Sequence, residues 1–457
     1  MTSSGPMILE ATAGDLTLGA NSIVTGASNS MTLEASANVT ESAAITHQTN
    51  GGNLIVWSDS DATGGGYIAI RATSVLSTDN GANSRTSTTT GNIVLAGGTD
   101  ISSPQDGIPD GVASATSGAT FCAVESGTFG GATTVTGYYA GAGNITMRGT
   151  SSSGTDGVCL NFATAMFANS ISLTGTATTG LGVQLSRFTS TTAATNLVAS
   201  SNTNPAISIN GTSSGTWGVL SAFNRTATNN VYLQATGTGG ITITGQTTGL
   251  TTSGYGDINL NSTNLLSAGG QIRLNSNAAT TSAGGVIIGG NSTTNFASSV
   301  STFGACAVAT CPASLITSTT ANVLVNTDTW MGYNNSSTAA GTPSQFNTSG
   351  TVSIIPKSTA GFAWISTANI GMASTVSGVT LGRDQATNNT SWTLSSSWNI
   401  AGPIEIYGGG VTIGANQTIT GSANRFLLKT TGNAATASSV SIQTNAGNIV
   451  FWSNADK

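Results

Sequence analysis

One short phrase is written four times between Gly239 and Gly290, with little but turn residues between the copies. The copies read G-G-I-T-I-T-G from Gly239, G-D-I-N-L-N-S from Gly256, G-Q-I-R-L-N-S from Gly270 and G-V-I-I-G-G from Gly285. Each begins with glycine and then alternates a large aliphatic residue with a small or polar one, as in a β-strand with one buried face. Strands this short are unstable alone, because their aliphatic face and backbone groups stay uncovered. The pattern therefore predicts a stack of strands.

The alternation also assigns each residue to a face of the predicted strands. The aliphatic positions are expected to point inward: Ile241, Ile243, Ile258, Leu260, Ile272 and Leu274. The polar positions between them are expected to point outward: Thr242, Thr244, Asn259, Asn261, Arg273 and Asn275. Changing Ile258 to Asp should then be severely destabilising, because it places an unpaired charge inside the stack. Changing Asn259 to Asp should be nearly neutral.

The same phrase recurs along the rest of the chain. Further copies begin at Gly91, Gly143, Ser170, Ala206, Gly378, Gly410 and Gly447. The aliphatic anchors Ile145, Ile171, Ile207 and Ile241 follow one another at unequal intervals. Such intervals fit a solenoid, whose repeats are roughly 20 to 50 residues long with turns of variable length. We therefore predict a single all-β domain over residues 1–457, a right-handed parallel β-helix of about 18 coils and on the order of 90 Å long.

Composition supports a folded solenoid. Only 6% of the 457 residues are charged and 60 are glycine, whereas about 25% of an ordinary globular domain is charged. The shortage of Lys, Glu and Leu leaves little material for amphipathic helices, and abundant glycine suits tight turns. Disorder is the alternative, but regularly placed Ile and Val residues and a mean hydropathy of +0.12 argue against it.

Charge and hydropathy exclude several classes of partner. The net charge is −6 and no cluster of Lys and Arg occurs, which argues against nucleic acid or an anionic membrane as a partner. No apolar run approaches the roughly 20 residues of a membrane span, so no membrane insertion is expected. Residues 1–19 lack the features of a secretion signal, which we expect to have been removed or to lie on a longer precursor. The Thr-, Asn- and Gly-rich composition suits an extracellular or cell-surface protein.

Two segments depart from the repeat and are predicted to be surface loops inserted into the solenoid. The first covers residues 100–143 and contains two prolines, two tyrosines and Cys122. The second covers residues 291–350 and contains Trp330. Loops of this kind are where solenoids place binding residues. The single histidine, His47, lies in a Thr/Asn-rich stretch and is expected to be a solvated side chain.

The four cysteines are compatible with an oxidising compartment. Cys306 and Cys311 are separated only by A-V-A-T, which favours a small disulfide-closed loop over a metal site, because no histidine or second cysteine pair lies nearby. Cys122 and Cys159 can form a second disulfide if their coils are neighbours. The alternative for each pair is two free, buried thiols.

One turn has the oxygen pattern of a calcium loop. Asp59, Asp61 and Thr63 alternate before a glycine, as in the first half of a calcium-binding loop. The bidentate acid expected later in such a loop is missing, because Ile70 stands there. The two interpretations are a calcium site on these three residues and a solvated turn with two exposed aspartates. No other cofactor is expected.

The repeats resemble those of a known family. The segments G-N-I-V-L, V-W-S-D-S-D followed by G-G-G, and G-V-T-L-G-R through W-N-I-A-G-P-I-E-I-Y-G-G-G-V-T-I are similar to bacterial right-handed β-helical surface proteins. These are the filamentous-haemagglutinin-like adhesins and autotransporter passengers. The resemblance spans most of the chain and is one of pattern more than identity. It implies an extracellular fibre or adhesin and carries over no catalytic residue.

The two ends of the chain look like halves of one coil. The complete copy runs from Trp57 to Thr73, whereas the carboxy-terminal copy stops at W-S-N-A-D-K, and the first strand ends in Ala-Thr as the complete copy does. The sequence therefore predicts that copies associate head to tail by strand addition into an open fibre. The residues expected at this junction are Trp452, Asp456, Met7, Leu9 and Ala11. The rival explanations are that the chain is one stretch of a longer protein and that the likeness of its ends is chance.

Three classes of function remain. Everything in the sequence serves stacking, so a structural or adhesive fibre subunit is favoured, with further copies of the chain, cell-surface glycans and neighbouring surfaces as partners. A polysaccharide-acting enzyme would need converging carboxylates, and only Asp59/Asp61 and Asp106/Asp110 are close in sequence, so no enzyme is expected. A carbohydrate- or ice-binding module is the third class. The outward threonines suit a lattice, but the unequal repeat spacing is expected to break the array.

Overall fold

The computed structural model describes residues 1–84, 87–116, 119–128, 135–152, 154–161, 163–186, 194–221, 231–248, 256–260, 263–277, 285–288, 302–304, 319–332, 344–367, 370–384, 387 and 390–454. Over these ranges the regular structure consists of strands and contains no helix. Accordingly, no membrane-spanning helix is found in the described ranges. The all-β fold class that the alternating pattern predicts is confirmed.

Apart from one extra strand, β12 (Ala113–Ala115), the strands follow a repeating order of three, so that every third strand returns to the same sheet. Sheet A contains β1 (Thr2–Ser3), β4 (Ser22–Ala27), β7 (Thr46–Asn50), β10 (Val75–Ser77), β14 (Val135–Tyr139), β17 (Ala163–Ala168), β20 (Thr195–Ala199), β23 (Val231–Ala235), β26 (Thr263–Ser267), β29 (Thr302–Gly304), β32 (Ser344–Asn347) and β35 (Ile370–Met372). Sheet B contains β2 (Met7–Ala11), β5 (Met31–Ala35), β8 (Leu54–Ser58), β11 (Ile93–Gly97), β15 (Asn144–Ser151), β18 (Ser170–Ala177), β21 (Ile207–Ser213), β24 (Ile241–Thr247), β27 (Ile272–Ser276), β30 (Val323–Asn326), β33 (Thr351–Ile355), β36 (Gly378–Leu381), β39 (Ile404–Gly408), β42 (Phe426–Thr430) and β45 (Ile449–Trp452), with β12 (Ala113–Ala115) paired to β15 off this path.

The third face of the solenoid is sheet C, which two small sheets extend. Sheet C contains β3 (Leu16–Leu18), β6 (Val39–Glu41), β9 (Ile68–Arg71), β13 (Val124–Thr128), β16 (Val158–Leu160), β19 (Val183–Leu185), β22 (Val219–Ser221), β25 (Ile258–Leu260), β28 (Val286–Ile288), β31 (Thr329–Gly332) and β34 (Trp364–Ser366). One small sheet contains β37 (Ser391–Leu394), β40 (Gly410–Ile413) and β43 (Ala434–Thr436), and the other contains β38 (Trp398–Ile400), β41 (Gln417–Ser422) and β44 (Ile442–Asn445). Because β37 lies against β34 and β38 against β35, the small sheets continue sheets C and A.

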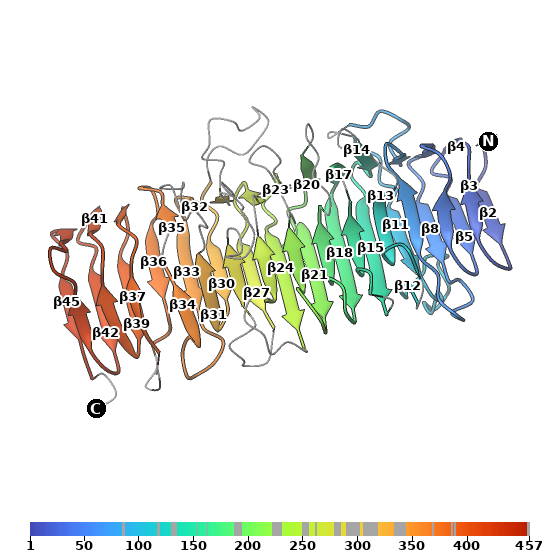
Figure 1. Ribbon diagram of the computed structural model, residues 1–457. Helices are drawn as coiled ribbons and strands as arrows, with labels where there is room; N and C mark the ends of the chain where they lie inside the picture. The colour runs from blue at the N-terminus through green and yellow to red at the C-terminus, as the bar shows by residue number, and fades with distance from the viewer. Residues whose placement is uncertain are drawn as a thin grey trace.

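Neighbouring strands of each sheet are parallel, as in the stacked pairs β15–β18 and β18–β21. Figure 1 shows the resulting rod, with sheet B facing the viewer and the two termini at opposite ends. The parallel β-solenoid that the repeats predict is therefore confirmed. Its right-handed winding stays a prediction.

The core is a set of straight columns of aliphatic side chains inside the stack. In sheet B the anchors Ile145, Ile171, Ile207 and Ile241 are register partners on successive strands, as their spacing predicts. The six residues expected to point inward are each fully buried: Ile241, Ile243, Ile258, Leu260, Ile272 and Leu274. Unequal intervals between anchors are thus absorbed by the loops, and the columns stay in register.

The outward assignment holds in sheet B and fails in sheet C. Thr242, Thr244, Arg273 and Asn275 are all partly or fully exposed. Asn259 is only 3% exposed, so the prediction that it faces solvent is wrong. Its register partners on the neighbouring strands are Leu220 and Ile287, which belong with Trp217 to a second apolar cluster on the outer side of sheet C. Asn261 lies outside the described residues.

Coils differ widely in length, which shortens the rod. Successive strands of sheet B are close in sequence where Ile404 pairs with Phe426 and far apart where Ile93 pairs with Ile145. The described path of sheet B has 15 strands, which corresponds to a rod about 70 Å long. The predicted values of about 18 coils and about 90 Å are therefore too large, because they assume short coils throughout.

Asparagine side chains join successive coils at the corner before sheet B. The backbone N–H of Asn92 donates to Oδ1 of Asn53 at 3.0 Å, and that of Asn144 donates to Oδ1 of Asn92 at 2.9 Å. Each side chain thereby satisfies a donor that the turn would otherwise leave unpaired. The residue that precedes the first aliphatic anchor of the repeat is therefore often asparagine.

The two predicted insertions are mixtures of loop and solenoid strand. Residues 100–143 include β12, β13 and β14, and Tyr138 of β14 is fully buried in the core. Residues 291–350 include β29 to β32, and Trp330 of β31 is fully buried near Phe346, with 6.3 Å between the ring centres. The prediction that these segments lie wholly outside the solenoid is wrong, because their strands lack the glycine-led phrase.

Candidate functional site

A cavity of about 460 Å³ lies on the outer face of sheet B near the amino-terminal end of the solenoid. Glu34 of β5 and Trp57 of β8, which are register partners, line it from the sheet. The opposite wall is the segment 98–112, which leaves β11 and returns to the sheet as β12 (Figure 1). This wall contributes Asp100 and Gln105. The first departure from the repeat thus supplies one side of a cavity.

Aspartates hold the segment 98–112 in shape. The carboxylate of Asp100 accepts the backbone N–H of Ser102 at 3.0 Å and that of Gly107 at 2.8 Å, and it also accepts the Ser102 hydroxyl. The hydroxyl bond contributes most to holding the pKa of Asp100 below its usual range, and the backbone donors add to it. Asp110 accepts the N–H of Ile101 at 2.9 Å. An ionised Asp100 therefore organises the wall.

Trp57 is fixed between the sheet and this wall. Its indole N–H donates to the carbonyl oxygen of Gly98 at 2.6 Å. On the far side of the segment the guanidinium of Arg148 donates to the carbonyl oxygen of Pro109. These two bonds tie the segment to side chains of β8 and β15, so the position of the indole ring is set by the fold.

The pKa of Glu34 is shifted in the opposite direction to that of Asp100. Burial raises the pKa of the Glu34 carboxyl, and the charge of its register partner Glu10 raises it further, while a hydrogen bond with Ser60 acts the other way. Glycosidases separate an acid from a base by holding two carboxyl groups of one cavity at different pKa values. Here the bonds to its own loop occupy the Asp100 carboxylate. The sequence missed this pair because the path of the segment 98–112 over sheet B, not distance in the sequence, brings Asp100 to the same cavity as Glu34.

The candidate calcium ligands form a self-contained turn. Asp59 accepts the backbone N–H of Gly65 at 3.2 Å, and Asp61 accepts that of Thr63 at 3.0 Å. Burial, followed by the neighbouring Asp61 charge, raises the pKa of Asp59, and the Gly65 bond opposes this shift. Ile70 is buried in β9, so that position supplies no later ligand. Calcium binding at Asp59, Asp61 and Thr63 stays a prediction.

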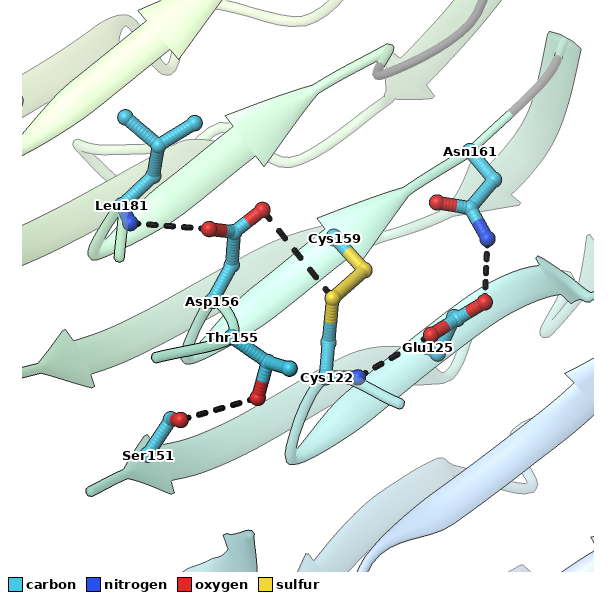
Figure 2. Close-up of a disulfide and its surroundings, with 8 residues drawn as sticks. All are labelled: Cys122, Glu125, Ser151, Thr155, Asp156, Cys159, Asn161 and Leu181. Atoms are coloured by element: carbon cyan, nitrogen blue, oxygen red, sulfur yellow. Dashed lines mark hydrogen bonds between the residues drawn. A yellow bond between two sulfur atoms is a disulfide. The ribbon is translucent and has the colours of Figure 1, made fainter. Parts of the chain in front are cut away.

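Cys122 and Cys159 form a disulfide, with Cα atoms 6.1 Å apart. Figure 2 shows buried carboxylates on both sides of the bridge. Asp156 lies 4.0 Å from the sulfur of Cys122 and accepts the N–H of Leu181 at 2.8 Å. On the other side Glu125 accepts the N–H of Cys122 at 3.0 Å. The bridge therefore joins β16 to the segment before β13, on neighbouring coils.

Among the described residues, Cys122, Asp156 and Cys159 also form the group whose ligand atoms lie close enough together to hold a metal ion. The ligand atoms of Cys122, Asp156 and Cys159 lie within 4.8 Å of one another. Sulfurs joined in a disulfide are not thiolates, so the oxidised cluster is a covalent link between coils. The predicted pair Cys306 and Cys311 lies outside the described residues.

A buried contact between a histidine and a carboxylate lies inside the solenoid where the sequence predicts a solvated histidine. His47 is fully buried in β7, and its Nε2 lies 3.2 Å from the carboxylate of Glu41. The second oxygen of Glu41 accepts the backbone N–H of Arg71 at 2.8 Å and the hydroxyl of Ser74 at 2.5 Å. The solvated interpretation is wrong, because T-H-Q-T-N alternates like the strands around it and places His47 inward.

The residues proposed for assembly lie at the two ends of sheet B. Met7 is 9% exposed, and Leu9 and Ala11 pack against the same core from partly buried positions. At the other end all four residues of β45 are exposed, and Trp452 lies with its ring centre 4.7 Å from Nζ of Lys429. Asp456 lies outside the described residues.

The two ends are not complementary halves of one coil. Ala11 ends a strand of sheet B and is the register partner of Ala35, whereas Ala72 follows β9 in sheet C. The amino-terminal strand is therefore a further copy of the first half of the coil, not the missing second half. The shared Ala-Thr pair does not identify a sheet, because Ala11 ends a strand of sheet B whereas Ala72 follows a strand of sheet C.

Comparison of the chain with known protein families, with curated proteins and with solved structures finds no match.

Proposed function

We propose that this chain is an extracellular structural or adhesive β-solenoid whose copies add head to tail through sheet B. The observation that carries the proposal is that β2 and β45, the outermost strands of the described sheet, end the same columns of inward side chains. Met7 and Leu9 begin the two columns in β2. Ile449 and Phe451 end them in β45. A second copy placed beyond β45 continues both columns without a change of register.

The backbone supports the same pairing from the β45 side. The carbonyl oxygen of Asn448 accepts the N–H of Phe426 at 2.9 Å. Because backbone groups alternate sides along a parallel strand, Ile449 and Phe451 direct theirs to the open edge. Open edges of this kind are templates for strand addition.

The β2 side is complementary. The N–H of Met7 donates to the carbonyl oxygen of Ser30 at 3.0 Å, so Ile8 and Glu10 direct their backbone groups outward from the edge. The side chain of Ile8 is 65% exposed, and Val450, in the matching column of β45, is 36% exposed. Strand addition would bring these two apolar side chains together. The contact is heterologous, so it extends as an open fibre.

Light scattering of the purified chain tests the proposal. The mean mass should rise with concentration beyond that of a monomer. Phe451→Pro removes one N–H that faces the open edge and should hold the chain at monomer mass, whereas Phe451→Leu keeps the N–H and should assemble. A wild-type chain that stays monomeric at high concentration, or equal assembly of both variants, would contradict the proposal.

A lattice-binding face is a second candidate, which the structure favours more than the sequence does. The outward residues of β15, β18, β21 and β24 stay in register despite unequal intervals, so the expectation of a broken array is wrong. One column contains Thr146, Ser172, Ser208 and Thr242, and another contains Thr150, Thr176 and Thr212. Thermal hysteresis that disappears in a Thr176→Lys variant would support ice binding, and absence of hysteresis in the wild type would exclude it.

The proposed role needs no catalysis. If the chain were a hydrolase, Glu34 and Asp100, whose pKa values are shifted in opposite directions, would be its carboxyl pair. Release of reducing sugar from mixed polysaccharides is therefore the direct check. Release that is abolished in Glu34→Gln would assign the chain to the hydrolases and overturn the structural role. No release supports the proposal.

A further inference from the structure

The cavity between sheet B and the segment 98–112 has the size and the lining of a ligand site. Small-molecule sites in proteins occupy about 300 to 1,000 Å³ and combine an apolar surface with a few placed polar groups. This cavity measures about 460 Å³ and combines one aromatic ring with hydroxyl, amide and carboxylate groups. It lies on the outer face of the rod, where a partner's surface can reach it. The surrounding sheet offers a rigid support.

The aromatic wall is held in one position. The bond from Trp57 to the Gly98 carbonyl, 2.6 Å long, uses the only polar atom of the indole. Trp57 lines the cavity and is partly exposed, so part of its ring is available as an apolar surface that a ligand does not need to order. Indole faces of this kind pack against flat apolar groups, among them the C–H face of a pyranose ring.

The polar lining suits hydroxyl groups. Glu34 offers carboxylate acceptors, Ser60 and Thr99 offer hydroxyls that both donate and accept, and Gln105 offers an amide. The amide N–H of Gln105 already donates to the carbonyl oxygen of Asp100 at 3.0 Å, which fixes its direction. A ligand with several hydroxyls around an apolar ring suits this mixture, whereas a purely apolar ligand would displace water from these polar groups without replacing its hydrogen bonds.

The charge of the cavity restricts the ligand further. Glu34 and Asp100 both line it, and Glu10 adds a third carboxylate in the adjacent position of β2. Among the lining residues that the structure describes there is no lysine or arginine. Anionic sugars would be repelled at this site, while neutral and amino sugars would not.

We infer that this cavity binds a hexopyranose unit that carries no acidic group, as part of a neutral or amino-sugar glycan. The inference rests on the proposed function, because an extracellular protein would meet such glycans. It also identifies the class of partner that an adhesive surface would bind. The Trp57 ring stacks on the sugar, and Glu34, Ser60 and Gln105 bond to its hydroxyls. The site is separate from the ends of the rod, so binding is independent of assembly.

Titration calorimetry of the purified chain with four trisaccharides tests the assignment. The neutral probes are cellotriose and mannotriose, the amino-sugar probe is the trimer of glucosamine, and the acidic probe is trigalacturonate. At least one neutral or amino-sugar probe should bind, and trigalacturonate should bind at least about tenfold more weakly, a difference of about 1.4 kcal/mol. The assignment would be overturned if none of the neutral and amino-sugar probes binds, or if all four probes bind equally well.

Variants locate the binding. Trp57→Ala should weaken it about tenfold or more, whereas Trp364→Ala, which removes a 45% exposed tryptophan from β34, should leave it unchanged. Ser60→Trp fills the cavity and should abolish binding with the melting temperature retained, which covers the case that Trp57→Ala unfolds. Binding that survives Ser60→Trp would overturn the site. If the chain binds sugar as a monomer, the site stands even though the fibre proposal fails.

Discussion

At the scale of single residues, the interior of this solenoid contains polar groups that its aliphatic columns do not require. Glu41 and His47 are both buried, with Nε2 of His47 3.2 Å from one carboxylate oxygen of Glu41, and the other oxygen of Glu41 accepts two hydrogen bonds. Removal of one partner from such a pair leaves the other polar group buried without its contact. The pair therefore fixes how the corner between sheets C and A packs.

A double-mutant cycle on this pair should show strong coupling. His47→Leu and Glu41→Leu should each destabilise the chain by about 3 kcal/mol, and the double variant should lose clearly less than the sum, because neither partner is then left alone. Chemical denaturation followed by circular dichroism measures this. Additive losses would show that the two side chains do not interact.

The covered face of sheet C changes one expected result. Ile258→Asp should be severely destabilising, since it places a charge in the core. Asn259→Asp should also destabilise, because Asn259 is 3% exposed between Leu220 and Ile287. Thr242→Asp, at a partly exposed position of sheet B, is the matched control and should be nearly neutral. Melting temperatures compare the three, and a neutral Asn259→Asp would show that this face is open to water.

Tyr407 should make the chain sensitive to alkali. Burial, followed by the adjacent Glu405 charge, raises the pKa of Tyr407 to about 12 from an ordinary value of 10.0. The protonated phenol is thus favoured in the folded state, so its contribution is complete below pH 10 and is lost as the pH rises towards 12. The Tyr407 hydroxyl donates a hydrogen bond to Glu405 at 3.2 Å. Tyr407→Phe should lower stability at pH 8, because this bond is lost, and should flatten the decline above pH 10. An unchanged alkaline decline would contradict this.

At the scale of elements, the long coil between β11 and β15 is held by covalent and hydrogen-bonded links. The disulfide closes a sequence separation of 37 residues, and Asp156 and Glu125 bond to the backbone on either side of it (Figure 2). Sheet pairing alone leaves such a long connection costly in chain entropy. The bridge therefore stabilises the part of the solenoid that carries the cavity wall.

Reduction should measurably loosen this region. Loss of the Cys122–Cys159 bridge should cost about 4 kcal/mol by the chain-entropy model, more than loss of a bridge between Cys306 and Cys311, which would close a much shorter loop. The melting temperature should fall in reductant, and a Cys122→Ala/Cys159→Ala double variant should melt low with and without reductant. A wild-type chain that melts at the same temperature in both conditions would contradict the structural role of the bridge.

At the scale of the whole molecule, the alternating pattern of Ile and Val residues was sufficient to predict the parallel solenoid and its inward columns. It was not sufficient for the outer surface. Burial of Asn259 depends on the cluster over sheet C, and the pairing of Glu34 with Trp57 depends on the register between strands of two successive coils. To predict the cavity wall, the path of segment 98–112 would also have to be known. Long-range placement of this kind leaves no mark in local periodicity.

The proposed assembly joins copies of the rod through the two ends of sheet B. Fifteen strands lie on its described path, so a copy stacked on β45 through its own β2 should repeat about every 70 Å along the axis. Electron microscopy of the concentrated chain measures this directly. The account predicts unbranched filaments one solenoid wide with that axial repeat. Separate rods the length of a single copy, or rods joined side by side, would contradict it.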